Sequence, residues 1–444
     1  MDNSCLSLPF PAVGGHEVVA RFDGGDLTSD AGLLFLRQAD KKLALVDALT
    51  TGIQDRRQAS KVEHSVRDVV AARVFAIAAG YEDANDLDSL RTDPALKMAC
   101  ERRPSQADLA SQPTISRLEN AVRPRDLLRM GIAMAERVIS ELPKKTRRVV
   151  LDVDATEDPC HGQQELEGFN AFYDTHCYLP LHLYVTGQDG VQRLLASLLR
   201  PGRANWRLGL FGLLRRAIGL LRARFPKVKI ILRTDAGFGY GETIAFCEEQ
   251  CIDFVLGLKS NSRLRVLSTP VQMWAALKYR REGDGCREWT EFSYKAGSWK
   301  RAQRVVVKAE VTRGELNPRY LVTSLGWKPH QVYLFYCQRG DRENRIKELK
   351  LDLASGRTSC HRFWANQFRL ILHSAACVLM QTLQEAARGT EWANVQAGTL
   401  RLRLLKVAAR VVETCRKVWF HLPSSCPVQE VWHHLNRRLT AGAT

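Results

Sequence analysis

The stretch Arg148-Val-Val-Leu-Asp-Val-Asp-Ala155 decides the fold, because it joins a strand-forming run to two acidic side chains. Its β-branched and apolar residues predict a buried β-strand. Asp152 and Asp154 lie two residues apart and therefore point to one face, whereas Leu151 and Val153 point to the opposite face, into a core. A strand of this kind indicates the start of an acidic site.

The segments that follow predict an α/β fold. Apolar runs at 177–186 and 191–199 indicate two more strands with hairpin-length links, and residues 206–225, 227–234, 241–250 and 252–259 read as helix, strand, helix and strand. A meander followed by crossover units predicts a mixed sheet with flanking helices. This is the element order of the ribonuclease H-like fold, in which the first and fourth strands are neighbours.

The whole chain divides into five expected regions. These are a mainly helical N-terminal region at 1–146 that is a candidate for DNA binding, a first part of the core at 147–264, a β-rich insertion at 265–330, the rest of the core at 331–390 and a basic C-terminal region at 391–444. In the first region, apolar spacing predicts helices at Val66–Ala79 and Leu127–Leu142. Capping residues at 27–30 predict a helix from Ala31. Three strand-like runs, 289–294, 304–311 and 319–324, indicate the insertion.

The charge of the chain favours a polyanionic partner. Lys and Arg number 65 against 48 Asp and Glu, and the excess lies in the middle and at the end of the sequence. Nucleic acid is favoured over a membrane surface or a merely basic protein. Residues 110–119 resemble the start of a recognition helix, in which Thr114 and Arg117 would face a DNA groove, although a plain structural helix has the same pattern. No run is apolar enough to span a membrane, and twelve scattered cysteines without a secretory signal indicate a cytoplasmic protein.

Two further acids complete a candidate site. Asp235 ends the fourth predicted strand, and Glu343 lies on a predicted helix that runs from about Tyr336 to Leu353. On that helix Tyr336, Arg339, Glu343 and Lys350 would form one stripe, although the stripe also fits ordinary salt bridges. Clustered carboxylates repel one another unless a cation neutralises them. We therefore expect two Mg²⁺ ions, with Mn²⁺ as a substitute, which would activate a nucleophile at a phosphodiester.

The segments that contain the three acids resemble the acid motifs of DDE transposases from bacterial insertion sequences. Members of this family carry a Tyr-Arg-Glu-Lys signature around the glutamate. The matching segments are residues 151–156, 232–238 and 339–347, and the resemblance extends from about residue 20 to about residue 420. It implies cut-and-paste DNA transposition in the bacterial cytoplasm, at the nucleoid, by a homodimer that binds double-stranded terminal inverted repeats and target DNA.

The resemblance also implies roles for individual residues. It assigns Asp154, Asp235 and Glu343 to metal binding and catalysis, because the family has a threonine two residues after its first acid, as Thr156 is here. Asp152 is then a secondary candidate. Tyr336, Arg339 and Lys350 would contact the DNA strand beside the scissile phosphate. Trp299, like Trp289 and Trp327, is a candidate for stacking on a flipped base, although each could instead fill the insertion's own core.

Two alternatives remain at this point. One is a metal-dependent nuclease of the same fold, which cuts strands but does not join them. The other is a DNA-binding protein derived from a transposase that has lost catalysis.

Overall fold

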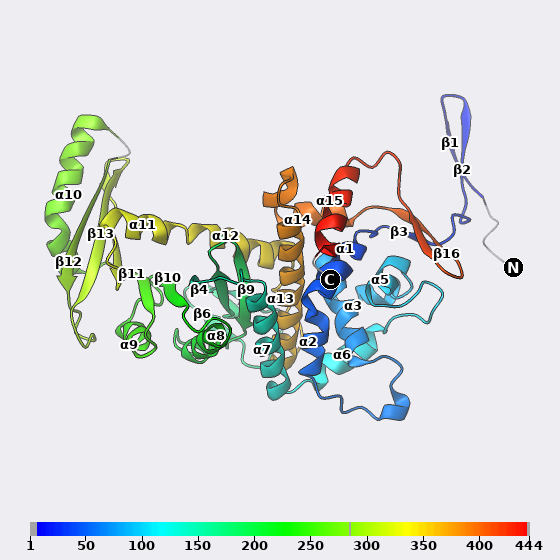
Figure 1. The fold of residues 1–444 in the computed structure, drawn as a ribbon, viewed down its shortest axis with the longest axis horizontal. Coiled ribbons are helices and arrows are strands. Elements are labelled where there is room, and N and C mark those ends of the chain that lie inside the picture. The colour runs from blue at the N-terminus through cyan, green and yellow to red at the C-terminus, as the bar shows by residue number, and fades with distance from the viewer. Residues whose placement is uncertain (1–6, 284–285, 442–444) are drawn as a thin grey trace. The chain divides into compact units, whose positions relative to one another are not determined.

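The computed structural model describes residues 7–283 and 286–441, except for the side chains of residues 341–343. The chain forms two compact units, whose elements are drawn in Figure 1. Unit 1 comprises Met1–Met130, Glu348–Arg357 and Ala375–Thr444, and unit 2 comprises Gly131–Lys347 and Thr358–Ser374. Unit 1 thus draws on both ends of the chain. The five regions expected from the sequence stay a prediction.

Unit 2 is built on a mixed sheet, which has nine strands among the described residues. The central strands are β4 (Arg148–Ala155), β8 (Leu181–Thr186), β9 (Gln192–Leu198), β10 (Lys229–Thr234) and β11 (Asp253–Leu258). Their order is β9-β8-β4-β10-β11, where β8 is antiparallel to β4 and β9, and β4, β10 and β11 are parallel. The predicted mixed sheet and the predicted pairing of its first and fourth strands are therefore confirmed.

Helices connect the parallel strands of this sheet. Helix α8 (Leu210–Arg224) precedes β10, and α9 (Gly241–Glu249) lies between β10 and β11, close to the predicted bounds. The buried residues of α8 recur at helical spacing and form one apolar face; they are Leu210, Leu214, Ala217, Ile218 and Leu221. The sheet contributes strand residues that are fully buried, such as Leu151 and Leu232, which are paired in register.

The link between the first two core strands differs from the prediction. Residues 156–180 do not form a hairpin but hold a second, three-stranded sheet of β5 (Asp158–Pro159), β6 (Gly168–Asn170) and β7 (Thr175–Tyr178). The apolar run at 177–186 is divided at Pro180, which lies between β7 and β8. Proline has no N–H to donate to a ladder, so a single strand does not continue through it.

The predicted insertion continues the main sheet. Its strands are β12 (Arg287–Tyr294), β13 (Gln303–Thr312), β14 (Glu315–Leu316) and β15 (Arg319–Thr323), and β15 pairs antiparallel with β11. Helix α10 (Ser262–Glu282) was not predicted, because Pro270 and exposed apolar residues on its outer side obscure the helical spacing. The helix packs Ala275 against Ala309 and Val311 of β13.

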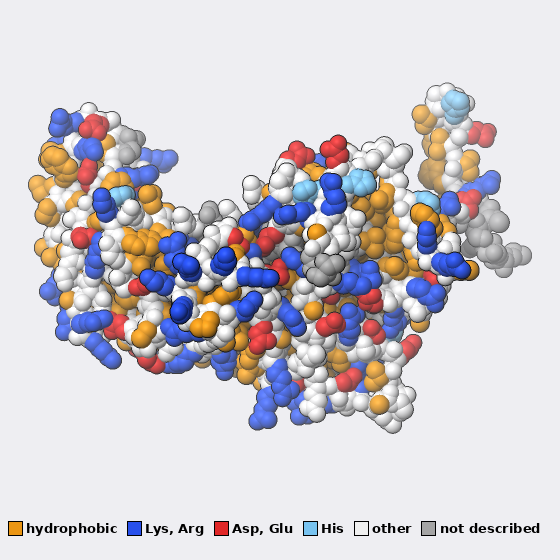
Figure 2. All heavy atoms as spheres, in the orientation of Figure 1, with side chains coloured by type: hydrophobic (Ala, Val, Ile, Leu, Met, Phe, Trp, Pro, Cys, Tyr) orange, Lys and Arg blue, Asp and Glu red, His pale blue; other side chains and the backbone are white. Residues whose placement is uncertain are grey.

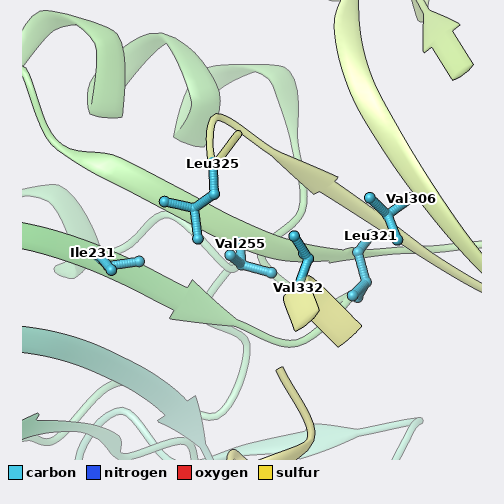
Figure 3. Packing of buried hydrophobic residues seen from close by; sticks show 6 residues of the cluster. All are labelled: Ile231, Val255, Val306, Leu321, Leu325 and Val332. Atoms are coloured by element: carbon cyan, nitrogen blue, oxygen red, sulfur yellow. The ribbon is translucent and has the colours of Figure 1, made fainter. Parts of the chain in front are cut away.

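Helix α11 (Pro329–Cys337) lies on the sheet through a buried apolar cluster, which is drawn in Figure 3. The cluster comprises Ile231, Val255, Val306, Leu321, Leu325 and Val332, so it joins strands of the core to strands of the insertion. Trp327, Phe335 and Tyr336 pack against its edge. This packing fixes α11 over the sheet.

Four elements lie near the positions where the chain passes from one unit to the other. They are α7 (Pro124–Ser140), α12 (Gly340–Lys347), a π-helical turn (Glu348–Asp352) and α13 (Phe363–Ala386). Helices α7 and α13 each contribute residues to both units. The predicted helix at Leu127–Leu142 corresponds to α7.

Unit 1 is mainly helical. Its elements are β1 (Leu8–Val13), β2 (His16–Ala20), β3 (Leu27–Thr28), α1 (Leu33–Leu43), α2 (Leu45–Thr51), a 3-10 turn (Ala59–Lys61), α3 (Val66–Ala79), α4 (Asp86–Leu90), α5 (Pro94–Ala99), α6 (Gln112–Ala121), a 3-10 turn (Glu391–Asn394), α14 (Ala397–Leu400), a π-helical turn (Arg401–Leu405), β16 (Ala409–Glu413), β17 (Val418–His421) and α15 (Gln429–Thr440). The prediction for Val66–Ala79 is confirmed, and Ser65 caps that helix. The exposed hairpin of β1 and β2 was not predicted.

A helix follows residues 27–30 as predicted, but the predicted capping by these residues is wrong, since the N-cap is Gly32. Residues 27–28 form β3, and α1 begins at Leu33. The side chain of Asp30 does not cap this helix but contacts distant residues. The carboxylate of Asp30 binds Lys406 Nζ at 2.7 Å and accepts a hydrogen bond from Tyr81 at 2.8 Å. A Cβ at Gly32 would lie 2.3 Å from the Leu404 carbonyl oxygen, so glycine is required where these two segments meet.

The surface drawn in Figure 2 carries many Lys and Arg side chains, in keeping with the net charge of +17. Among the described residues, no helix combines the length and apolar character that crossing a bilayer requires.

Candidate active site

Asp154 and Asp235 lie side by side at one edge of the main sheet. Asp154 is the penultimate residue of β4, and Asp235 directly follows the last residue of β10. In the parallel pairing of these strands Thr234 lies opposite Val153, so the next residues along the two strands are the two acids. The register of the sheet therefore brings together two of the acids that the sequence singled out.

Arg339 lies between the two carboxylates. Its Nη2 atom is 2.8 Å from Asp154 Oδ2 and 3.7 Å from Asp235 Oδ2. Each acid also accepts a backbone hydrogen bond on its Oδ1 atom, from Ala155 N at 3.0 Å and from Gly237 N at 2.9 Å respectively. The side chains of Arg339 and Asp154 are each 13% exposed and that of Asp235 is 38% exposed, so the pair is shielded but reachable.

Asp152 is engaged differently from Asp154. It is fully buried and forms a bidentate pair with Arg233, at 2.7 Å from Oδ1 to Nε and 2.9 Å from Oδ2 to Nη2. Both side chains are nearly inaccessible, at 0% and 3% exposure. Both oxygens of Asp152 therefore bind one guanidinium inside the core, whereas Asp154 remains partly exposed.

Arg233 connects this buried pair to helix α11. Its Nη1 atom donates a hydrogen bond to the Phe335 carbonyl oxygen, and its guanidinium carbon lies 4.8 Å from the centroid of the Phe335 ring. Tyr336 is the next residue, and Arg339 follows three residues later. The ion pair of Asp152 with Arg233 therefore holds the segment that carries two of the expected DNA-contacting residues.

Tyr336 and Arg339 line a cleft of about 570 Å³ beside the acids. Arg319 and Lys259 line it as well, so three of its side chains are cationic. Gly257 permits the close packing at its base, because a Cβ there would lie 2.7 Å from Ala236 N and 2.8 Å from the Tyr336 hydroxyl. A cationic cleft next to two carboxylates suits a phosphodiester strand.

The single helix predicted from Tyr336 to Leu353 is wrong. A two-residue turn at Gln338 and Arg339 separates α11 from α12, and Arg339 N bonds to Tyr336 O in the tighter i to i+3 pattern. The proposed stripe therefore does not lie on one regular helix. The side chain of Glu343 lies outside the described residues, and Lys350 lies in a π-helical turn of unit 1.

Tyr173 is a neighbour of the acids that the sequence did not reveal. Burial raises the pKa of its hydroxyl above the usual range, and the carboxylates of Glu157, Asp154 and Asp235 raise this pKa further. Tyr173 lies between β6 and β7 of the small sheet, where the sequence predicts only a hairpin-length link. Its signal was missed because no motif or strand spacing marks residues 171–174.

The remaining predicted contacts lie elsewhere. Thr114 and the exposed Arg117 are on α6 in unit 1, where Ser111 begins the helix as expected, although its side chain does not cap the backbone. Trp299 is only 6% exposed and packs against Tyr294, with ring centroids 5.4 Å apart. Stacking of Trp299 on a base would therefore require its loop to open.

The structure thus places a pair of acids at the ends of adjacent parallel strands in a mixed sheet. The model of the family described as Transposase DDE domain group 1 matches residues 10–443, and the chain belongs to that family. A search of the curated proteins found none that matches the chain. Family membership implies that the chain functions as a transposase, and that its family consists of enzymes that bind DNA and typically use divalent metals.

Proposed function

We propose that this chain is an active DDE transposase that cleaves DNA strands at the ends of an insertion sequence and joins them to target DNA. The observation that carries the proposal is the juxtaposition of Asp154 and Asp235 around Arg339. The strand order β9-β8-β4-β10-β11 supports a ribonuclease H-like core, and family membership supports the reaction class. The substrate is double-stranded DNA with terminal inverted repeats, and the working form is a homodimer.

The donor set of this site fits a hard divalent cation. Asp154 and Asp235 each direct an Oδ2 atom toward the cationic Arg339, and carboxylate oxygens are the ligands that Mg²⁺ prefers. No cluster of three or more acidic, histidine or cysteine side chains occurs among the described residues, and the proposed third ligand, Glu343, is not described. When bound, Mg²⁺ or Mn²⁺ would supply an activated oxygen nucleophile and stabilise the leaving oxygen.

The side chains around the acids bind and orient the DNA strand. The guanidinium of Arg339 can exchange its contacts with the carboxylates for contacts with a DNA phosphate. Carboxylate and phosphate groups are both anions that accept two parallel hydrogen bonds from arginine. Tyr336 lies in the same cleft and would fix the strand beside the scissile bond. Lys350, Thr114, Arg117 and Trp299 remain proposed DNA contacts.

Substitution of the acids tests this proposal. The purified full chain is given Mg²⁺ and the DNA that flanks its coding sequence, and strand cleavage and strand joining are measured separately. Asp154→Asn and Asp235→Asn are each expected to reduce cleavage by at least about a thousandfold, as loss of a principal electrostatic group does. Asp174→Asn is the matched control, because Asp174 is exposed and its left-handed backbone (φ of 51°) accepts asparagine.

The outcomes distinguish the alternatives. Cleavage that survives in Asp154→Asn contradicts the assignment of this acid. Wild-type protein that cuts but never joins strands is a nuclease of the same fold, and wild-type protein that binds without cutting is a DNA-binding derivative.

A further inference from the structure

A second group of cations lies at the edge of the sheet opposite to the acids. The group, called here the basic edge, consists of Lys144, Lys145, Arg147, Arg148, Lys227 and Lys229, all of them exposed. They precede or begin β4 and β10, where Lys229 lies opposite Arg148 and Lys229 N bonds to Arg147 O at 2.8 Å. From Arg148 to Asp154 strand β4 rises by about 20 Å, so this edge is separate from the catalytic acids.

The positive charge of the basic edge is not balanced locally. Segments 143–150 and 224–234 contain no Asp or Glu. Among the described residues, no carboxylate forms an ion pair with any of the six cations. By contrast, Arg207, just before α8, pairs with Glu242 at 2.7 Å, and Arg215 of α8 pairs with Glu249 at 3.7 Å. Grouped unpaired cations repel one another and attract a polyanion.

A hollow adjoins the basic edge. It measures about 650 Å³, and its described lining combines Arg148 with Trp327 and the amide side chains of Gln188, Gln331 and Gln338, without a carboxylate. The guanidinium carbon of Arg148 lies 5.9 Å from the centroid of the Trp327 ring. Guanidinium and amide groups are donors for phosphate and sugar oxygens, which carry most protein–DNA hydrogen bonds.

We infer that the basic edge is a second DNA-binding surface, which holds the phosphate backbone of duplex DNA without reading its sequence. The inference rests on the proposed function for the identity of the polyanion. A membrane is disfavoured, because no large exposed apolar side chain occurs at 143–150 or 227–229 to enter a bilayer. Two contact surfaces on one sheet would hold DNA over a longer path than the cleft alone.

A salt titration of DNA binding tests this inference. The full chain is mixed, without metal, with a random-sequence duplex of about 30 base pairs, and affinity is measured by fluorescence anisotropy over a range of salt concentrations. The variant Lys144→Gln, Lys145→Gln, Lys227→Gln, Lys229→Gln should lose at least about tenfold in affinity. The slope of log affinity against log salt should become shallower by about 2 to 4, since each phosphate contact contributes about 0.9.

The matched control removes four exposed cations from the insertion. The variant Arg263→Gln, Arg280→Gln, Arg281→Gln, Arg313→Gln has the same change in net charge and should keep a slope close to that of the wild type. Both variants must melt at the wild-type temperature. A wild-type slope in the lysine variant, or an equal loss in both variants, overturns the inference, as does a lysine effect seen only with anionic phosphatidylserine vesicles.

The measurement needs no catalysis. Failure of the chain to cleave DNA would overturn the proposed function and leave the titration interpretable, whereas an unchanged slope would overturn only the basic edge.

Discussion

The guanidinium of Arg339 lies 2.8 Å from the Asp154 carboxylate, although 185 residues separate the two in sequence. Without DNA, the acid is thus neutralised by a cation of the chain itself. The same nitrogen is 3.7 Å from Asp235, which reduces the repulsion between the two carboxylates. Arg339 therefore competes with any divalent ion for these oxygens.

Removal of Arg339 should strengthen metal binding by the protein without DNA. In Arg339→Ala the two carboxylates lose their internal cation, and Mn²⁺ should bind several-fold to about tenfold more tightly, an effect of about 1 kcal/mol. Isothermal titration calorimetry with Mn²⁺ measures the change. Arg339→Lys keeps the positive charge and should resemble the wild type. Unchanged or weaker Mn²⁺ binding in Arg339→Ala would contradict competition by the guanidinium.

Asp152 should be far more important for stability than Asp154. Asp152→Asn leaves the guanidinium of Arg233 uncompensated in the core and should lower the free energy of unfolding by about 3 to 5 kcal/mol. Asp154→Asn, at the open edge, should lower it by about 1 kcal/mol or less. Urea unfolding monitored by circular dichroism gives both values.

A double substitution provides the control for Asp152. Asp152→Leu combined with Arg233→Met replaces the pair by apolar side chains and should cost less than either single substitution. Additive costs would show that the two side chains do not act as a pair.

Asp40 should make the stability of unit 1 dependent on pH. It is 5% exposed, and burial raises its pKa from 3.8 to about 6, against the smaller opposing effect of the Val46 backbone N–H. Because the folded state holds this proton more tightly, the stabilisation is complete below about pH 4 and is lost as the pH rises through 6. The loss should be on the order of 3 kcal/mol by pH 8.

Asparagine at this position isolates the effect. Asp40→Asn cannot ionise, so its free energy of unfolding, measured by urea titration at several pH values, should lack this decline. If the wild type and Asp40→Asn change in parallel between pH 4 and 8, another group is responsible.

The sequence was sufficient for those parts of the fold that depend on local pattern. Strand β4, helix α3 and the order of the main-sheet strands and helices α8 and α9 follow from apolar spacing, and the pairing of β4 with β10 follows from that order. The location of Asp154 and Asp235 at one edge is a consequence of the same pairing. Their metal-binding roles, and that of Glu343, stay predictions.

Other features depend on contacts between distant segments, which spacing does not encode. The different surroundings of Asp152 and Asp154 could not be inferred from their shared strand face, because the partner of Asp152 is Arg233, which lies 81 residues away. Tyr173 approaches the acids only because residues 156–180 fold as a separate small sheet. The break before Gly340 could not be inferred either, since the local sequence is compatible with continuous helix.

The backbone ladder between β11 and β15 has a mechanical consequence. Strand β15 of the insertion pairs with β11, and β11 pairs with β10, which Asp235 directly follows. The insertion therefore cannot swing as a hinged flap without breaking backbone hydrogen bonds of the main sheet. Force applied by DNA to the outer strands would instead be transmitted as a twist of the whole sheet. A displacement of the outer strands of the insertion would thereby change the distance between Asp154 and Asp235, because the sheet deforms as a unit.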